Sequence, residues 1–150
     1  MAVGKTERLD DVLATIKELA DGRLCTNGPM QHAVAAALSG DRTYQNDFRS
    51  ELKVRAELTS KRLNNIPGIS CVPPAAAFYA MPKVDLPDGR TDEEFVLGLL
   101  HQTGILCVYG SGFGTDPGDG FFRIVFLASP DKLDNYCDAI AEFAVDFLAS

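Results

Sequence analysis

Apolar residues recur at helical spacing through the first 65 residues of the chain. Residues 9–19 carry an apolar position every three or four residues, which predicts an amphipathic helix that ends near Gly22. A second helix is expected over residues 29–38, and because this stretch is alanine-rich and nearly uncharged, we expect it to be buried. A long third helix is expected over residues 44–65, and Pro67 and the glycine after it end it.

The long third helix carries basic residues along its length. We expect them to form a solvated face, because lysine and arginine are rarely buried. They are Arg49, Lys53, Arg55, Lys61 and Arg62.

From residue 69 the pattern changes to short runs of β-branched and aromatic residues separated by proline and glycine. Four strands are expected, over residues 69–72, 78–84, 105–109 and 121–127. Because proline cannot donate to a strand ladder, Pro82 predicts that the second strand lies at an edge or bulges.

Two helices are expected among and after these strands. Thr91 and Glu94 have the spacing of a capping box, which begins a helix that Gly104 ends. Ser129 begins the last helix, whose single apolar stripe consists of Leu133, Cys137, Ile140, Phe143 and Phe147. The elements predict an α+β fold: one small, mostly antiparallel sheet with helices on one face, preceded by helices that do not obviously belong to it.

Composition and charge limit the kinds of partner. The chain has 150 residues, 46% of them apolar and 23% charged, which suits one globular domain or a small domain with an appendage. A formal net charge of −7 argues against nucleic acid or an anionic membrane as the general partner. The apolar runs are too short to span a bilayer.

The cysteines do not have the spacing of a metal site. Cys25, Cys71, Cys107 and Cys137 are far apart in the sequence, and the chain has only two histidines, so we expect no metal. With no secretory leader at its start, the chain is expected to keep free, buried thiols in a reducing cytoplasm. A catalytic cysteine is the minor alternative, since the sequence places no base beside any of them.

One charged residue interrupts the most apolar of the expected strands. In residues 121–127, alternation places Arg123 on the face opposite Phe122 and Ile124. We expect both faces to be buried, so the guanidinium must meet an anion. Two interpretations are equal on this ground: an internal salt bridge with one of the chain's acids, or a site for an anionic ligand.

The glycine-rich sequence G-S-G-F-G at residues 110–114 precedes this strand. It joins two expected strands, whereas the dinucleotide fingerprint has a different spacing and needs the N-terminus of a helix for the pyrophosphate. A flexible connection between the strands is one alternative. The interpretation that we favour is a loop kept small so that a ligand or another domain can approach its backbone.

Three segments occur in an order that is specific. They read A-F-Y-A-M-P at residues 77–82, V-Y-G-S-G-F-G at 108–114 and G-F-F-R-I at 120–124. This order resembles the C-terminal part of the fold type I, pyridoxal-phosphate-dependent aminotransferases of class I and II, which have G-A-F-Y-x-x-P, then P-G-S-x-F-G, then a strand with R-[IL]. Residues 24–40 also resemble the end of the family's large domain, so the similarity covers essentially the whole chain.

The resemblance implies a role for two residues. Arg123 matches the arginine that grips the α-carboxylate of the substrate with paired hydrogen bonds. Asn27 resembles part of a segment near the active site across the family's dimer interface, and capping of the next helix is equally compatible with its position. The chain departs from the family at Ala76, where glycine is usual, and at Tyr109, where proline commonly begins the loop, which leaves substrate preference open. The loop followed by Phe-Arg is closer to alanine-type than to aspartate-type enzymes.

The family's cofactor lysine lies in S-x-S/T-K followed by G-x-R-x-G-W, and Lys5 lacks those neighbours. We therefore expect no catalytic and no cofactor-binding residue in this chain, pyridoxal phosphate only in a full-length enzyme, and no transamination by the chain alone. The resemblance implies that residues 1–43 end the large cofactor-binding domain. Residues 44–150 would then be the small domain, with 44–65 as the linking helix.

The expected function is thus the carboxylate-binding part of an aminotransferase that moves an amino group between an amino acid and a 2-keto acid, in a cytoplasmic homodimer. The alternative is a stand-alone module that uses Arg123 to hold a small carboxylate, or that caps a partner protein, without catalysis. A third possibility is that the first forty residues expose an apolar face, which self-association would cover.

Overall fold

The computed structural model describes residues 10–22 and 27–149. The chain divides into two compact units, residues 1–43 and 44–150. The first unit contributes α1 (Asp10–Asp21) and α2 (Gly28–Ser39). Lys5 and Cys25 lie outside the described residues.

Helices α1 and α2 lie where the periodicity predicts them, but the expected burial of α2 is wrong. Within the described residues, neither helix has a buried side chain, and Val34 and Leu38 are 55% and 65% exposed. Low charge marks a helix that is able to be buried. Burial also needs a partner surface, and the described part of this unit does not supply one.

Helix α3 (Thr43–Asn64) is the expected long helix, and its second half packs into the 44–150 unit. The side chain of Asn64 ties the helix end to the following strand: Cys71 N donates to Asn64 Oδ1 (2.9 Å) and Asn64 Nδ2 donates to Cys71 O (2.8 Å). The chain turns between them at Gly68, whose φ of +78° favours glycine.

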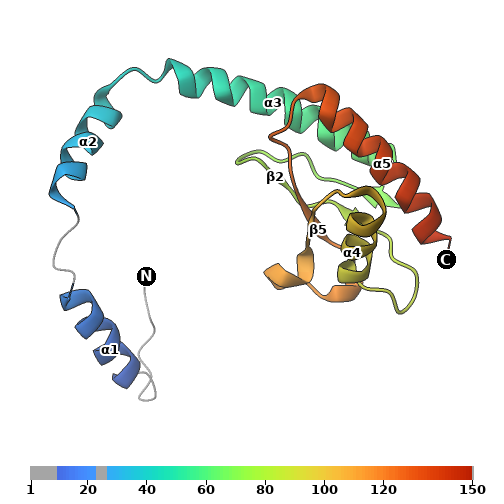
Figure 1. Ribbon diagram of the computed structural model, residues 1–150, viewed down its shortest axis with the longest axis horizontal. Coiled ribbons are helices and arrows are strands. Elements are labelled where there is room, and N and C mark those ends of the chain that lie inside the picture. Colours follow the sequence, from blue (N-terminus) through green and yellow to red (C-terminus); the bar gives the residue numbers. More distant parts are fainter. Residues whose placement is uncertain (1–9, 23–26, 150) are drawn as a thin grey trace. The chain divides into compact units, whose positions relative to one another are not determined.

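The expectation of a solvated basic face on α3 is wrong for two of its five basic residues. Arg55 donates to the Leu127 carbonyl (2.7 Å), and Arg62 Nε lies 3.0 Å from Asp134 Oδ1 and also pairs with Asp138. Figure 1 shows α5 (Pro130–Leu148) beside the C-terminal part of α3, where Arg62 joins the two helices. Helical spacing places these arginines on α3 and also explains the pair of Arg55 with Glu51. Their acceptors outside α3 come from residues more than seventy positions later.

The strands are shorter than expected and form two antiparallel sheets instead of one. One sheet has the order β1-β3 and the other β2-β5-β4. The strands are β1 (Ile69–Ser70), β2 (Tyr79–Ala80), β3 (Lys83–Val84), β4 (Val108–Tyr109) and β5 (Phe122–Val125). Pro82, which has no N–H to donate, lies where the second expected strand divides into β2 and β3.

Helix α4 (Asp92–Thr103) has the predicted capping box. Glu94 N donates to Thr91 Oγ1 (3.2 Å), and Thr91 N donates to Glu94 Oε2 (3.0 Å). The helix ends at Gly104, whose φ of +75° and N–H bond to the Leu100 carbonyl (2.9 Å) form the expected stop.

The core lies between the helices and one face of the sheets, which confirms the α+β class (Figure 1). Phe95 of α4 is fully buried, and its ring centroid lies 5.2 Å from that of Phe122 of β5 and 5.3 Å from that of Phe143 of α5. The apolar stripe of α5 faces this core, as predicted. Ser129 begins α5 without a side-chain capping bond, and its carbonyl accepts from Leu133 N (3.0 Å).

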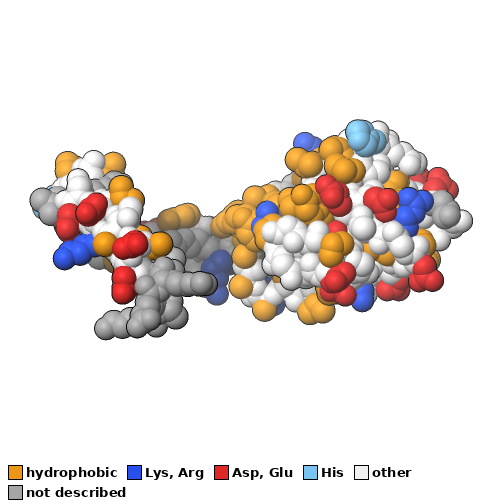
Figure 2. Space-filling model, turned by 90° about the horizontal axis from the view of Figure 1, so that it is seen from below, with side chains coloured by type: hydrophobic (Ala, Val, Ile, Leu, Met, Phe, Trp, Pro, Cys, Tyr) orange, Lys and Arg blue, Asp and Glu red, His pale blue; other side chains and the backbone are white. Residues whose placement is uncertain are grey.

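The opposite face of β5 is open, which corrects the expectation that both faces are buried. Phe122 and Phe126 are buried, whereas Val125 is 49% exposed. In the view of Figure 2, acidic side chains are spread over the surface, with exposed hydrophobic side chains among them. Phenylalanine and β-branched residues suit either side of a strand, so composition alone did not reveal the open face.

Ala77 has a left-handed backbone conformation, with φ of +59°. This conformation costs an L-residue about 1–2 kcal/mol, which exceeds the entropic cost of glycine in the unfolded chain. We expect Ala77→Gly to raise the free energy of unfolding by about 0.5–1 kcal/mol in urea denaturation. The neighbouring substitution Ala75→Gly is the control and should lower it, and a loss of stability in Ala77→Gly would refute the strain.

Candidate functional site

Arg123 lies on β5, the central strand of the three-stranded sheet. Val108 of β4 is its partner across the ladder, and Tyr79 of β2 is the partner of Val125, two residues further along β5. Cross-strand partners and their diagonal neighbours share a face of the sheet, so Tyr79 and Val108 lie on the open face with Arg123. Antiparallel pairing therefore surrounds one cation with apolar side chains.

Two aromatic rings hold the guanidinium. Arg123 Cζ lies 4.8 Å from the ring centroid of Tyr79 and 4.2 Å from that of Phe113. We call these two rings the aromatic clamp. A cation in contact with an aromatic face is stabilised by about 0.5–1 kcal/mol at an exposed site, and the in-plane N–H donors remain able to bind a carboxylate.

Arg123 has no acidic partner in the part of the chain that the structure describes. No carboxylate of these residues lies within 4.0 Å of its guanidinium, and its buried Nε has no hydrogen-bond partner. The internal salt bridge that the sequence left open is thus not found among them. The arrangement offers a fixed cation with unused donors, which is the chemistry of an anion site.

Phe113 comes from a short 3₁₀ helix, η2 (Gly110–Phe113), which follows β4. Gly110 N donates to the Phe121 carbonyl (2.7 Å), and a Cβ at position 110 would lie 2.5 Å from Phe121 Cβ. Close approach of this chain's own backbone therefore explains Gly110. The approach of a ligand or another domain to this loop, which we favoured, stays a prediction. The φ of +96° at Gly114 explains a second glycine.

A buried carboxylate also holds η2. Asp92, the first residue of α4, is 0% exposed and accepts from Ser111 N (2.6 Å) and Ser111 Oγ (2.9 Å). Sequence reasoning missed this residue, because an acid in the first turn of a capped helix is usually solvated. What distinguishes Asp92 from a solvated first-turn acid is its bonding to Ser111, nineteen positions later in the sequence.

Asn27 belongs to the 1–43 unit and precedes α2. Its side chain makes no capping bond to the first turn, and its carbonyl accepts from Met30 N (3.1 Å). The structure thus does not show the capping alternative, and the role of Asn27 in substrate binding stays a prediction.

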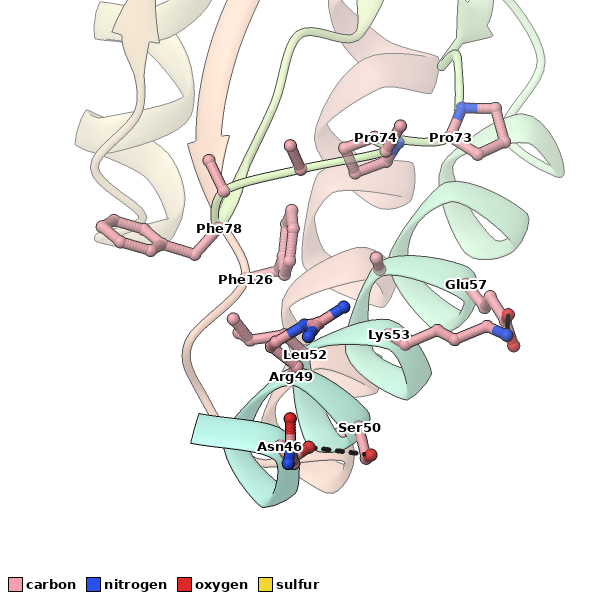
Figure 3. Close-up of a pocket in the computed structure, with 14 residues that line it drawn as sticks. Asn46, Arg49, Ser50, Leu52, Lys53, Glu57, Pro73, Pro74, Phe78 and Phe126 are labelled. Carbon is pink, nitrogen blue, oxygen red and sulfur yellow. Dashed lines mark hydrogen bonds and ion pairs between the residues drawn. The ribbon is translucent and has the colours of Figure 1, made fainter. Parts of the chain in front are cut away.

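A cleft of about 1010 Å³ lies between α3 and residues 73–78. Figure 3 shows Arg49 reaching from α3 toward Phe126, while Lys53 turns to Glu57 at the outer side. Arg123 does not line this cleft. One wall, Phe78, packs against Tyr79 with tilted rings whose centroids are 4.4 Å apart, so the cleft adjoins the back of the aromatic clamp.

The described cysteines are free and buried. Burial raises the pKa of the Cys107 thiol to about 12 and that of Cys137 to about 11. These groups are protonated at neutral pH, which makes them poor nucleophiles. A thiol of the unfolded chain ionises near pH 8.5, below the pKa of the same thiol in the folded chain. The stability of the fold therefore falls as pH rises above about 8.5.

The described residues include no group of three or more histidine, cysteine or acidic side chains that could hold a metal. Within residues 10–22 and 27–149, no helix is long and apolar enough to cross a membrane.

Comparisons with known proteins show the family of the chain. Residues 2–140 match the family model for aminotransferase class I and II. The chain belongs to this family, whose enzymes are fold type I and depend on pyridoxal phosphate. The family that the sequence resembled is thus confirmed.

Alanine aminotransferases are among the most similar relatives. The chain is 38% identical to glutamate-pyruvate aminotransferase AlaA of Haemophilus influenzae, over 86% of this chain and 33% of that protein. It is 34% identical to alanine aminotransferase of Mycobacterium tuberculosis, over 96% of this chain and 34% of that protein. The structure of alanine aminotransferase from Pyrococcus furiosus matches with a TM-score of 0.78 and 41% identity, over 93% of this chain and 35% of that one. The chain therefore spans about a third of the length of these relatives.

Alkylation tests the burial of the thiols. A thiol with a pKa of about 11 or 12 is ionised at pH 8 far less than an ordinary thiol. We expect iodoacetamide to modify Cys107 and Cys137 about 100-fold more slowly in the native chain than in denaturant, as resolved by peptide mass spectrometry. Equal rates in the two states would contradict the buried placement.

Proposed function

We propose that the 44–150 unit is the carboxylate-binding small domain of a pyridoxal-phosphate-dependent aminotransferase. The observation that carries this proposal is Arg123, a permanent cation on an open sheet face, held by two rings and without an acidic partner among the described residues. An α-carboxylate would pair with its in-plane donors through two parallel hydrogen bonds. The apolar neighbours Tyr79 and Val108 would exclude water and strengthen that pair.

The described residues do not by themselves fit pyridoxal phosphate. The cofactor needs a lysine that can become a neutral nucleophile, which requires burial or a neighbouring cation. Of the described lysines, Lys83 is half-buried with its Nζ 5.8 Å from the Phe121 ring centroid, and the others are exposed. In a full-length enzyme the cofactor would supply the chemistry of amino transfer, and this unit would bind and orient the substrate.

The substrates that we propose are L-alanine and glutamate with their keto acids. The names of the similar relatives, alanine aminotransferase and glutamate-pyruvate aminotransferase, support this choice. Both substrates carry the α-carboxylate that Arg123 would bind. The side chain would be read by residues outside this unit, since the clamp contacts only the arginine.

The proposal includes the organisation of the whole enzyme. Residues 1–43 would complete the large cofactor-binding domain, α3 would link the domains, and Asn27 would lie near the active site of a homodimer. The apolar side chains that α1 and α2 expose support this, because such surfaces need a cover. The free cysteines agree with a reducing compartment, and we propose the cytoplasm.

Arg123→Lys tests the role of the guanidinium in an enzyme that joins this chain to a cofactor-binding part. A point ammonium cannot replace a two-pronged pair, so we expect the KM for L-alanine to rise about tenfold or more. Arg49→Lys, in the neighbouring cleft, is the matched control and should leave the KM unchanged. A wild-type KM in Arg123→Lys would contradict the assignment of Arg123 as the carboxylate-binding residue.

The 150-residue chain alone should not transaminate. We expect no alanine-dependent formation of glutamate from 2-oxoglutarate when pyridoxal phosphate is added, and no stable absorbance band of lysine-bound cofactor. A stable band that persists after gel filtration would contradict this part of the proposal.

The stand-alone carboxylate-binding module is the second candidate, and the same Arg123 geometry favours it. The two candidates differ in what precedes residue 1. A reading frame that continues upstream into a cofactor-lysine sequence supports the enzyme, whereas carboxylate binding without any such sequence supports the module.

A further inference from the structure

The clamp ring of Phe113 needs something to keep it in place. It is 51% exposed and lies at the end of η2, a helix of four residues. A helix this short has little stability of its own. The position of Phe113 over Arg123 must therefore come from contacts that η2 makes with the rest of the unit.

Two contacts hold η2, one at each of its first two residues. Gly110 N donates to the Phe121 carbonyl, which fixes the start of η2 against the chain just before β5. Ser111 donates its N–H and its hydroxyl to the carboxylate of Asp92, which fixes η2 to the start of α4. The contact to Asp92 lies two residues before Phe113, so it is the last one before the ring.

Burial of Asp92 calls for an explanation beyond helix capping. A fully buried carboxylate costs several kcal/mol unless it is compensated. The capping box of Thr91 and Glu94 already satisfies the start of α4 without Asp92. The two bonds from Ser111 use the carboxylate to hold the loop.

We propose that Asp92 positions Phe113 over Arg123, so that a carboxylate on α4 sets the orientation of the carboxylate-binding guanidinium on β5. The link runs from Asp92 to Ser111, along η2 to Phe113, and from its ring to Arg123 Cζ at 4.2 Å. Asp92 is a positioning residue and does not touch the substrate. Its importance for substrate binding rests on the proposed function of Arg123.

The clamp favours binding because it orders the arginine in advance. A free arginine side chain loses about 2 kcal/mol of rotamer entropy when it is fixed. The two rings fix the guanidinium before a ligand binds, so ligand binding itself loses less entropy. The in-plane donors remain available to the ligand. If Asp92 releases η2, the bond from Gly110 N to the Phe121 carbonyl still holds its start, but the half-exposed ring of Phe113 is less restrained.

NMR of the ¹⁵N-labelled 150-residue chain tests the link directly. The Arg123 Nε–H resonance, assigned by its absence in Arg123→Lys, reports ring currents from the clamp. We expect Asp92→Asn to move this resonance toward its position in Phe113→Leu, because the amide is uncharged and replaces one of the two oxygens that accept from Ser111 with an NH2 group. In the Phe113→Leu background, Asp92→Asn should have no further effect.

Matched variants separate positioning from stability. Glu94→Gln changes an acid in the same turn of α4 without touching η2, and should leave the resonance in place. Ser111→Ala keeps the backbone bond and loses the hydroxyl bond, so a smaller shift in the same direction is expected even where Asp92→Asn does not fold. An unmoved resonance in both Asp92→Asn and Ser111→Ala, or an equal shift in Glu94→Gln, overturns the proposal.

Titration with sodium acetate, against sodium chloride as the control, separates this inference from the proposed function. The wild-type Arg123 resonance should shift with acetate, and Asp92→Asn should raise the apparent Kd for acetate about threefold. A wild-type resonance that ignores acetate but moves in Asp92→Asn supports the positioning and contradicts the carboxylate site. A resonance that responds to acetate equally in wild type and Asp92→Asn supports the site and overturns the role of Asp92.

Discussion

The site depends on the permanent positive charge of Arg123. It lies on the central strand of a sheet that has one face on the core and one face open. Within the 44–150 unit, α4 and α5 pack on the face of β5 that carries Phe122, where Phe95 and Phe143 fill that side of the sheet. Arg123 points to the other face, where its nearest partners are aromatic rings. Its charge therefore remains available to a ligand, since rings stabilise a cation without neutralising it.

The fold is arranged so that this face stays both open and ordered. Pro82 ends β2 early, which divides the sheet and leaves Tyr79 on a short edge strand. Gly110 and Asp92 fix the loop that carries Phe113. The residues that shape the site are thus spread over 45 positions of the chain, from Tyr79 to Arg123, and meet only through antiparallel pairing and loop contacts.

Local signals predicted the helices well and the tertiary contacts poorly. The Thr91–Glu94 capping box and the stripe of α5 depend on residues close in sequence, and both are found as expected. The motif order made Arg123 a candidate, and alternation placed it opposite Phe122. Asp92 and Arg62 could not be assigned in this way, because Ser111 and the acids of α5 lie far away in the sequence. Burial of α2 was predicted from low charge, but burial is a property of a helix and its partner together.

Under the proposed function, the 44–150 unit would supply one half of a site, and the ordering of Arg123 by two rings would serve that role. A carboxylate clamp in an aminotransferase works on a substrate whose reacting atoms are held elsewhere, so orientation is its contribution to catalysis. In this account the 44–150 unit contributes orientation and exclusion of water, and the remainder of a full-length enzyme contributes the cofactor.

The most direct test is a crystal structure of an enzyme that contains this chain, with an amino-acid substrate analogue bound. The account predicts both carboxylate oxygens of the analogue within about 2.7–2.9 Å of the Arg123 guanidinium nitrogens. A carboxylate bound away from Arg123, with that arginine paired to an acid of the protein, would contradict it.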